Sequence, residues 1–451
     1  MSEGGVFENM AIRTFKGGVH PSYNKDATYA KPIRPMPSPG KVVIPLHQHT
    51  GAPCEPIVKV GDEVKVGQKI GDSKAHLTSP IHASVSGKVK AVAKHPQSSG
   101  VDGLSIVIES DGLDTPDETI KPRDNADNLT PDELIGIIRE AGIVGLGGAA
   151  FPTYFKLTPP AGKTFDTLLL NGAECEPYLS ADHRLMVERP ADVVAGARLL
   201  MKTIGVERAV IGIENNKPDA ISALREVAEG DDRIGIVPLG VKYPQGAEKQ
   251  LISAILGREV PSGGLPVDVG VVVNNVGTAV AVKEAVLDGM PLTRRVVTIA
   301  GSCVKEPGNL MVPIGTLVND IIEACGGLRI PPKKAIIGGP MMGIAQYTTE
   351  IPVTKGTSGI LLLSDKEVVL DDVLPCIRCG KCVETCPMNL MPIWIAGYAE
   401  ASRFDDSERL GALDCIECGC CSFICPSRRR LVQGIRLAKA EIRARRNVKR
   451  G

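Results

Sequence analysis

The segments CIRCGKCVETCP (residues 376–387) and CIECGCCSFICP (residues 415–426) decide how the C-terminal part of this chain folds. Both have the spacing C-x2-C-x2-C-x3-C-P, which is typical of segments that hold two [4Fe-4S] clusters, the fourth cysteine of each run serving the other cluster. Three thiolates on one tight loop reach three corners of a cube, so the fourth corner is met from a distant segment. Pro387 and Pro426 then turn the chain away. The spacing therefore predicts two clusters with these ligands: Cys376, Cys379, Cys382 and Cys425 for one, and Cys415, Cys418, Cys421 and Cys386 for the other.

Zinc is an alternative ligand for paired cysteines, because C-x2-C pairs also form tetrahedral thiolate sites. Zinc ribbons use four cysteines per ion, so two identical runs with trailing prolines fit zinc poorly. Disulfides fit less well, since the N-terminus does not resemble a secretory signal and the cysteines have ligand spacing. Cys420 lies out of register in the second run, and we interpret it as a packed neighbour of the cluster. We interpret the remaining cysteines as ordinary reduced thiols: Cys54, Cys175, Cys303 and Cys325.

The composition indicates a soluble, turn-rich chain of several domains. Its 451 residues suggest about three or four domains of typical size. The 52 basic residues balance the 52 acidic residues, so no global charge favours nucleic acid. The 49 glycines and 34 prolines favour turns over long helices. No run approaches the roughly 18 apolar residues of a spanning helix, so we expect any link to a membrane to be peripheral.

From residue 41 to about residue 110, short β-branched runs alternate with turns, which predicts a small all-β module. The stretches 60–68 and 79–87 resemble the barrel-sandwich of biotinyl and lipoyl domains. A carrier domain of that kind needs a lysine at its hairpin tip, and Lys74 is the nearest candidate. The flanks of Lys74 and its distance to Gly87 do not match the carrier pattern, so we interpret the module as structural.

The middle of the chain has the alternation of an α/β domain with a mainly parallel sheet. Thr130, Pro131 and Glu133 form the signature of a helix start, a capping box with proline in the first turn. Strand-like runs then alternate with helical stretches, and past Arg294 the pattern changes to a small mixed α+β unit. These changes predict six parts: an N-terminal arm (1–40), the barrel-sandwich module (41–110), the α/β domain (129–290), the small α+β domain (294–372), the two-cluster domain (373–427) and a basic tail (428–451).

A glycine-rich loop, GLGGAAFPTYFK (residues 145–156), follows the first predicted helix. It contains a nominal G-x-G-x-x-A, but a dinucleotide fingerprint has to follow a strand and open a helix. Here a helix precedes the glycines and Pro152 follows at once, so the ordinary Rossmann interpretation fails. The remaining prediction is that the glycines let backbone N–H groups approach an anionic or planar ligand, to which Lys156 adds charge.

Four motifs of this domain resemble those of the NADH-oxidising flavoprotein subunit of respiratory complex I. They are the glycine loop, NGAECEP (171–177), YPQGAE (243–248) and NNVGT (274–278), and they occur in that family's order. In the family the loop and its lysine hold FMN, while acidic groups and the loop phenylalanine shape the NADH site. The chain departs from the family at Ala173, Ala247 and Gly277, where the relatives carry acids.

This resemblance implies the residues of both sites. For FMN it implies Gly145, Gly147, Gly148, Lys156, Asn171, Glu174, Tyr243, Asn274, Asn275 and Thr278. For NADH it implies Phe151, Glu176 and Glu248. Taken singly, each of the three glutamates would be interpreted as solvated surface charge. Hydride transfer itself requires no acid–base residue, so no catalytic residue is nominated.

The order of the parts resembles the RnfC family of the Rnf membrane complexes over nearly the whole chain. The barrel-sandwich module, the segment FKGGVHP (15–21) and the two-cluster domain carry this resemblance. It implies a multidomain α/β and α+β fold: a barrel-sandwich β module, a Rossmann-like FMN/NADH domain, a β-grasp-like domain of the SLBB type and a helical, ferredoxin-like domain with two clusters.

The function implied is that of an NADH-dependent oxidoreductase within a larger translocase. The chain would exchange electrons between NADH/NAD+ and a membrane-bound, ion-translocating complex through FMN and two [4Fe-4S] clusters. The resemblance also implies peripheral attachment at the cytoplasmic face of the membrane, with the other subunits as partners and ferredoxin reached through one of them. Two alternatives remain open, namely a soluble flavoprotein similar to cobalamin reductases and an electron-transfer scaffold without flavin.

The segment 428–451 is strongly basic, with ten basic residues and one acid between residues 428 and 450. Its apolar residues fall near one helical face: Leu431, Ile435, Ala438 and Ile442. A solvated basic helix is one interpretation, but such patterns also suit acidic lipid surfaces or partner proteins. In the second interpretation the tail attaches the chain to the membrane complex, and truncation after Pro426 would spare both clusters.

Overall fold

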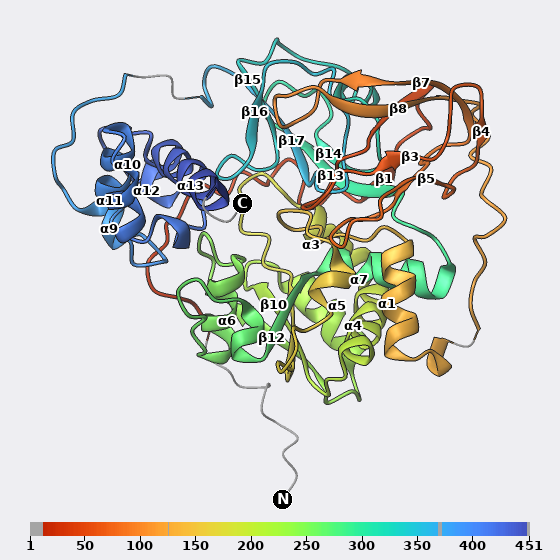
Figure 1. Ribbon diagram of the computed structural model, residues 1–451, viewed down its shortest axis with the longest axis horizontal. Coiled ribbons are helices and arrows are strands. Elements are labelled where there is room, and N and C mark those ends of the chain that lie inside the picture. Colours follow the sequence, from red (N-terminus) through yellow and green to blue (C-terminus); the bar gives the residue numbers. More distant parts are fainter. Residues whose placement is uncertain (1–11, 125, 369–371, 449–451) are drawn as a thin grey trace, which may run out of the picture.

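Figure 1 shows a computed structural model of the chain, in which residues 12–124, 126–368 and 372–448 are described. The barrel-sandwich module and the α+β domain lie side by side above the α/β domain, and the cluster-bearing helices form a lobe at one side. Within the described residues, no helix is both long and apolar enough to cross a membrane.

The N-terminal module consists of two antiparallel sheets with the strand orders β2-β8-β7-β4 and β3-β5-β6. Its strands are β2 (Lys41–Pro45), β3 (Glu55–Pro56), β4 (Glu63–Val64), β5 (Lys69–Asp72), β6 (Ile81–His82), β7 (Gly87–His95) and β8 (Gly103–Ser110). Val42 pairs with Ile108 and Ile44 pairs with Ile106, and all four side chains are fully buried. These β-branched pairs therefore form the centre of the module's core.

The α/β domain is built on a parallel sheet with the strand order β11-β10-β9-β12. Its strands are β9 (Thr167–Asn171), β10 (Ala209–Glu214), β11 (Ile234–Leu239) and β12 (Val271–Asn275). The chain continues from β9 to β10 on one side and later returns to β12 on the other side. Asn171 and Asn275, which end β9 and β12, are paired in register at this switch point. Ligands of open α/β sheets bind at such switch points, beyond the carboxyl ends of the strands.

Helices cover this sheet and begin and end at ordinary signals. They are α1 (Pro131–Glu140), α2 (Thr153–Lys156), α3 (Ala181–Glu188), α4 (Pro190–Ile204), α5 (Pro218–Ala228), α6 (Glu248–Leu256) and α7 (Val276–Lys283), with short turns η1 (Ala126–Asn128), η2 (Pro266–Val269) and η3 (Glu284–Asp288). Thr130 and Glu133 form the predicted capping box at α1. Gly196 lets α4 approach α7, because a Cβ atom there would lie 2.0 Å from the carbonyl oxygen of Ala279.

The small α+β domain takes one strand from the N-terminal arm. Its sheet has the order β1-β14-β13-β17-β15-β16, with β1 (Ile33–Pro35) parallel to β14 at the edge. The other elements are β13 (Arg294–Ala300), β14 (Gly308–Pro313), α8 (Val318–Ala324), β15 (Lys334–Ile337), β16 (Ile344–Gln346) and β17 (Gly359–Leu363). Further upstream, Val19 exchanges two backbone hydrogen bonds of 2.8 and 2.9 Å with Tyr243 of the α/β domain. The arm thus connects separate domains.

The cluster-bearing lobe contains two similar turns followed by helices. Its elements are α9 (Lys381–Glu384), α10 (Pro392–Glu400), α11 (Phe404–Arg409), η4 (Ala412–Asp414), α12 (Cys420–Phe423) and α13 (Leu431–Val448). Gly380 and Gly419 precede α9 and α12 with φ angles of 78° and 86°. Arg378 and Glu417, at matching positions of the two runs, have φ angles of 56° and 58°. The sequence repeat is therefore also a repeat of backbone conformation.

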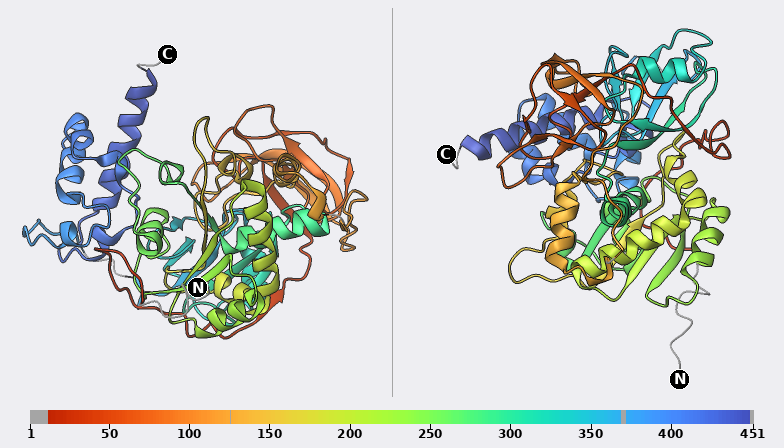
Figure 2. Two further views of the ribbon diagram at one scale, coloured as in Figure 1. Left: turned by 90° about the horizontal axis from the view of Figure 1, so that it is seen from below. Right: turned by 90° about the vertical axis from the view of Figure 1, so that its right-hand side faces the viewer.

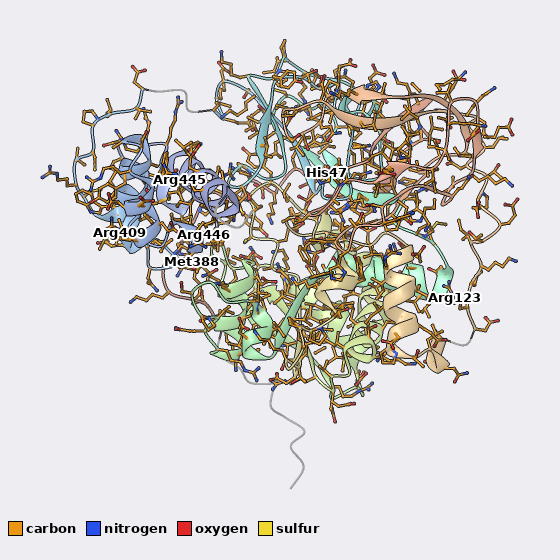
Figure 3. All side chains as sticks on the ribbon, viewed as in Figure 1. His47, Arg123, Met388, Arg409, Arg445 and Arg446 are labelled. Carbon is orange, nitrogen blue, oxygen red and sulfur yellow. The ribbon has the colours of Figure 1, made fainter. Side chains whose placement is uncertain are left out.

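The basic segment after Pro426 forms α13, the long helix that leads to the C-terminus in Figure 2. Its apolar face packs against α10 and α11, and the four apolar residues are at most 1 % exposed: Leu431, Ile435, Ala438 and Ile442. The expectation that this face is available to a membrane is therefore wrong, because the small lobe needs it for a core. Arg409, Arg445 and Arg446 project from the same lobe (Figure 3).

Candidate functional site

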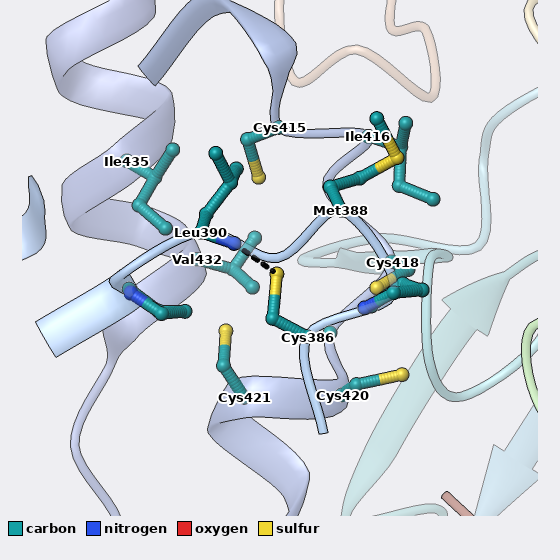
Figure 4. Close-up of a pocket in the computed structure, with 13 residues that line it drawn as sticks. Cys386, Met388, Leu390, Cys415, Ile416, Cys418, Cys420, Cys421, Val432 and Ile435 are labelled. Atoms are coloured by element: carbon teal, nitrogen blue, oxygen red, sulfur yellow. Dashed lines mark hydrogen bonds between the residues drawn. The ribbon is translucent and has the colours of Figure 1, made fainter. Parts of the chain in front are cut away.

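Four of the predicted cluster ligands line one pocket between α12, α13 and the loop after α9 (Figure 4). Cys415, Cys418 and Cys421 come from the second run, and Cys386 comes from the first. Leu390, Val432, Ile435 and other apolar side chains form the rest of the wall. The structure thus brings together the four thiols that the crossed spacing assigns to one cluster.

Backbone amides surround the sulfur atoms of this site. The N–H groups of Leu390 and Glu417 donate to the sulfurs of Cys386 and Cys415, at N–S distances of 3.4 and 3.3 Å. Burial raises the pKa of the Cys415 thiol to about 11 and that of Cys421 to about 12. A metal therefore has to displace these protons, and amide donors at the sulfurs raise a cluster's reduction potential.

The second set of predicted ligands lies closer to solvent. Cys376 and Cys379 are exposed, whereas Cys382 and Cys425 are half-buried. Burial raises the pKa of Cys382, and negative charge on Cys425 or Cys379 would raise it further, so these side chains are neighbours. Among the described residues, no three His, Cys, Asp or Glu side chains lie close enough together to hold a single metal ion.

Cys420 lies outside both ligand sets. Its side chain is fully buried, and its sulfur donates to the carbonyl oxygen of Tyr243 at 3.8 Å. Figure 4 shows the sulfur pointing away from the sulfurs of Cys386, Cys415 and Cys421. This placement agrees with the interpretation of Cys420 as a packed neighbour.

The glycine loop lies against the start of α7, at the switch point of the parallel sheet. The N–H group of Leu146 donates to the hydroxyl of Thr278 at 3.0 Å. A Cβ atom on Gly147 would lie 2.8 Å from the amide nitrogen of Asn275, so only glycine fits there. Gly148 is exposed, and nothing lies within 4 Å of the position of its missing Cβ atom. The loop therefore combines a close backbone approach with an open turn.

The side chains at this switch point fit a polar, planar ligand such as FMN. Asn274 is buried, and its side-chain nitrogen has no hydrogen-bond partner among the described residues. Buried polar groups are nearly always paired, so an unpaired donor beside an open glycine turn suits a missing acceptor. Asn275 is occupied instead, because it caps α7 by accepting from Gly277 and donates to Asp182 at 2.7 Å. Asn171 donates to the carbonyl oxygen of Gly246 at 2.8 Å.

The three glutamates of the predicted sites have different partners. Glu174 accepts from the N–H groups of Asp182 and His183, at the start of α3. Glu176 accepts from the N–H groups of Met341 and Met342 in the α+β domain, and burial raises its pKa to about 7. Glu248 pairs with Lys156 at 2.6 Å. The same glutamates therefore also stabilise the fold around the proposed site.

The segment 243–250 touches both the switch point and the cluster pocket. The hydroxyl of Tyr243 donates to the carbonyl oxygen of Cys418 at 2.8 Å, and its ring is 2 % exposed. Gln250 donates to the carbonyl oxygen of Pro387 at 3.1 Å. Gly246 accepts from Asn171, as described above. One short segment therefore joins the glycine-loop site to the pocket of Cys386, Cys415, Cys418 and Cys421.

Sequence reasoning missed two buried lysines beneath the NGAECEP motif. Lys25 of the arm donates to the carbonyl oxygen of Glu174 at 2.6 Å, and burial lowers its pKa to about 8. Lys217 donates to the carbonyl oxygen of Ala173 at 2.7 Å and pairs with Glu214 at 3.0 Å. Neither lysine lies in a recognisable motif, so no local signal could have found them.

Comparison with known families agrees with this architecture. The chain matches the RnfC barrel sandwich hybrid domain over residues 13–113 and the Nuo51 FMN-binding domain over residues 138–284. It matches the SLBB domain over residues 296–345 and the 4Fe-4S dicluster domain over residues 368–426. A flavin-binding α/β domain joined to a two-cluster domain defines an electron-transfer flavo-iron–sulfur protein.

Three similar relatives cover nearly the whole chain. The C-type subunit of the Na+-translocating ferredoxin:NAD+ oxidoreductase complex of Acetobacterium woodii is 51 % identical over 97 % of this chain and 99 % of the relative. The corresponding proton-translocating relative of Clostridium ljungdahlii is 51 % identical over 96 % of this chain and 95 % of the relative. The C-type subunit of the ion-translocating oxidoreductase complex of Rhodobacter capsulatus is 41 % identical over 98 % and 86 %, respectively. The chain belongs to the RnfC family, the C-type subunits of the Rnf complexes.

These findings confirm the resemblance, the fold class and the cofactor classes expected from the sequence. The chain is part of an oxidoreductase and carries electrons with flavin and iron–sulfur chemistry. The alternatives of a soluble cobalamin reductase-like protein and a scaffold without flavin are not favoured, since the family profiles and the relatives agree on RnfC. The individual ligand and flavin contacts remain predictions.

Proposed function

We propose that this chain exchanges electrons between NADH/NAD+ and a membrane-bound, ion-translocating complex, using FMN and two [4Fe-4S] clusters. The observation that carries the proposal is the segment 243–250, which links the glycine-loop site directly to a pocket lined by four cluster thiols. The chemistry that FMN supplies when bound is the conversion between the electron pair of a hydride and the single electrons that cubane clusters carry.

The residues proposed to hold FMN surround the switch point. They are Gly145, Gly147, Gly148, Lys156, Asn171, Glu174, Tyr243, Asn274, Asn275 and Thr278. The glycines give backbone access, Lys156 offers a positive charge, and the free amide of Asn274 offers a donor. NADH is proposed to contact Phe151, Glu176 and Glu248, whose side chains lie beside the same loop or the adjoining domain.

The two sets of cysteines occupy different positions along this route. The set with Cys386 and Cys418 lies against the α/β domain, through the contacts of Tyr243 and Gln250. The other set includes the exposed Cys376 and Cys379. We therefore assign the first set to the cluster next to the flavin site and the second set to the cluster next to the partner protein.

The partners in this proposal are the other subunits of the complex, with ferredoxin reached through one of them. NADH is a cytoplasmic reductant, which supports peripheral attachment at the cytoplasmic face of the membrane. Attachment is testable by sedimentation with membranes that contain or lack the other subunits. Equal sedimentation with both kinds of membrane would contradict specific assembly.

The central experiment uses the full chain, purified without oxygen. We expect about eight iron atoms per chain with equal sulfide, one non-covalent FMN, and loss of the oxidised-flavin absorbance on addition of NADH. Zinc in place of iron would overturn the cluster assignment. Flavin that stays oxidised with excess NADH would overturn the NADH site.

A further inference from the structure

The barrel-sandwich module contacts the glycine loop of the α/β domain. The hydroxyl of Thr50 donates to the carbonyl oxygen of Ala149 at 2.9 Å. The hydroxyl of Tyr154, just after the loop, donates to the carbonyl oxygen of His76 at 2.7 Å. Residues 72–78 of the module, which we call the clamp loop, therefore border the proposed nucleotide site.

The base of the clamp loop is fixed to α1 by ion pairs. Lys69 lies 2.6 Å from Glu140, and Asp72 lies 4.0 Å from Arg139. Buried interactions hold the other end, where Lys355 donates to the carbonyl oxygen of Pro80 at 2.6 Å. The position of the clamp loop over the α/β domain is thus set by the fold before any ligand binds, which lowers the entropy cost of binding.

Three aromatic rings form a row from the clamp loop to the glycine loop. The centroids of His76 and Phe155 lie 5.2 Å apart, and those of Phe155 and Phe151 lie 5.8 Å apart. His76 is exposed and both phenylalanines are half-buried, so the row is accessible from solvent. Gly147 lies at the other side of the glycine loop, against Asn275. The row therefore leads away from the switch point where the flavin is proposed to bind.

We propose that the clamp loop forms the outer wall of the NADH site, with His76 and Phe155 contacting the adenine of NADH. This inference rests on the proposed NADH site at Phe151. The nicotinamide has to lie at the flavin, so the adenosine half has to extend away from the switch point. Purine rings stack on aromatic side chains, and loss of one such contact typically weakens binding about tenfold. The barrel-sandwich module, which carries no modified lysine in this view, is then part of the substrate site.

The test compares ligands that contain the two halves of NADH separately. ADP-ribose contains the adenine without nicotinamide, and reduced nicotinamide mononucleotide contains the nicotinamide without adenine. With the FMN- and cluster-loaded full chain, we expect His76→Ala to weaken ADP-ribose binding in calorimetry about tenfold and to raise the KM for NADH similarly. The rate with reduced nicotinamide mononucleotide and the FMN content should stay unchanged. His76→Phe should restore binding, and Phe155→Leu should behave like His76→Ala.

His95→Ala, in strand β7 of the same module, is the matched control and should bind ADP-ribose like the wild type. Unchanged ADP-ribose binding in both His76→Ala and Phe155→Leu would overturn the inference while leaving the proposed function intact. Equal losses with NADH and with reduced nicotinamide mononucleotide would also overturn it, since they indicate a structural role. A wild-type chain whose flavin is reduced by neither nicotinamide would instead overturn the proposed function itself.

Discussion

The side-chain amide of Asn274 is a buried donor whose hydrogen bond is missing among the described residues. An unsatisfied buried donor costs about 1–3 kcal/mol, and an acceptor on a bound ligand would remove that cost. We expect Asn274→Ala to weaken FMN binding about tenfold, while the melting temperature of the FMN-free protein changes little. Fluorescence titration with FMN and calorimetric melting of the apo-protein measure the two effects.

Asn275→Ala is the control for this prediction, because Asn275 has internal partners. It caps α7 and bonds to Asp182, so its loss should destabilise the apo-protein by about 1 kcal/mol or more. If Asn274→Ala instead lowers the apo-protein's melting temperature as much as Asn275→Ala does, the amide of Asn274 serves the fold and not the ligand.

Cys386 tests the crossed ligation. Cys386→Ala should lower the iron content from about eight to about four atoms per chain, because it removes one ligand of the cluster held by Cys415, Cys418 and Cys421. Cys420→Ala should retain about eight, since its sulfur points away from the pocket. Iron analysis with electron paramagnetic resonance shows which cluster remains. Loss of the cluster of Cys376, Cys379 and Cys382 in the Cys386 variant would contradict the assignment.

The ligands of the clusters could be predicted from the sequence because each run encodes its own turn. The spacing places thiols around a tight loop, and residues such as Gly380 and Gly419 allow its positive φ angles. Lys25 and Lys217 could not be predicted, since each reaches its partner from a distant segment without a local pattern. The three aromatic rings of the clamp loop and glycine loop were hidden for the same reason.

Helix α13 shows how an element can be misinterpreted when its basic composition is considered alone. Its apolar face contributes to the core that also holds Cys415 and Cys421, and Lys439 donates to the carbonyl oxygen of Cys415 at 2.7 Å. Truncation after Ser427 should therefore lower the iron content well below about eight atoms per chain, contrary to the expectation from the sequence. Iron and sulfide analysis of the truncated chain provides the measurement.

Two positions on α13 provide a matched pair for this prediction. Ile435 is 1 % exposed and lines the cluster pocket, whereas Leu437 is 47 % exposed. Ile435→Ser should cost roughly 2–5 kcal/mol and lose iron, but Leu437→Ser should stay within about 0.5 kcal/mol of the wild type. Full iron content in the truncated chain and in Ile435→Ser would show that α13 is dispensable for the lobe.

The parallel sheet and the first helix followed local signals, so their existence could be predicted from the pattern of apolar residues and the capping box. Strand β1 differs, because the extended arm becomes a strand only by pairing with β14 far along the chain. The sequence indicates extension there but contains no partner for it. Long-range pairing of this kind is a tertiary property.

At the scale of the whole molecule, the domains meet in small shared cores. Val19 of the arm, Tyr243 of the α/β domain and Cys418 of the cluster lobe pack in one cluster, with Met341 of the α+β domain beside it. A Cβ atom on Gly419 would lie 2.9 Å from the carbonyl oxygen of Met341. Four parts of the chain thus hold the cluster pocket against the α/β domain, so the electron route depends on the assembled molecule and not on one domain.

A second junction is centred on Lys355, which is about 1 % exposed. The ammonium group donates to the carbonyl oxygens of Pro80 and Gly142, each at 2.6 Å, and so joins three domains. Burial lowers its pKa to about 7. Burial and the charge of Lys355 also lower the pKa of His49 to about 4 and that of His82 to about 3. These groups therefore favour their neutral forms in the folded protein.

The lowered pKa of Lys355 predicts how stability depends on pH. Between pH 7 and the ordinary value of 10.5, the unfolded chain binds a proton that the folded chain does not bind. The contribution of Lys355 to stability therefore rises with pH in this window, by up to about 1 kcal/mol per pH unit, and is lost as the pH falls to 7. Melting temperatures of the wild type and of Lys355→Met, measured from pH 7 to pH 10, isolate this contribution as a difference. We expect the wild type to gain on the variant as the pH rises; parallel curves would mean that Lys355 titrates at its ordinary pKa and that the junction does not desolvate it.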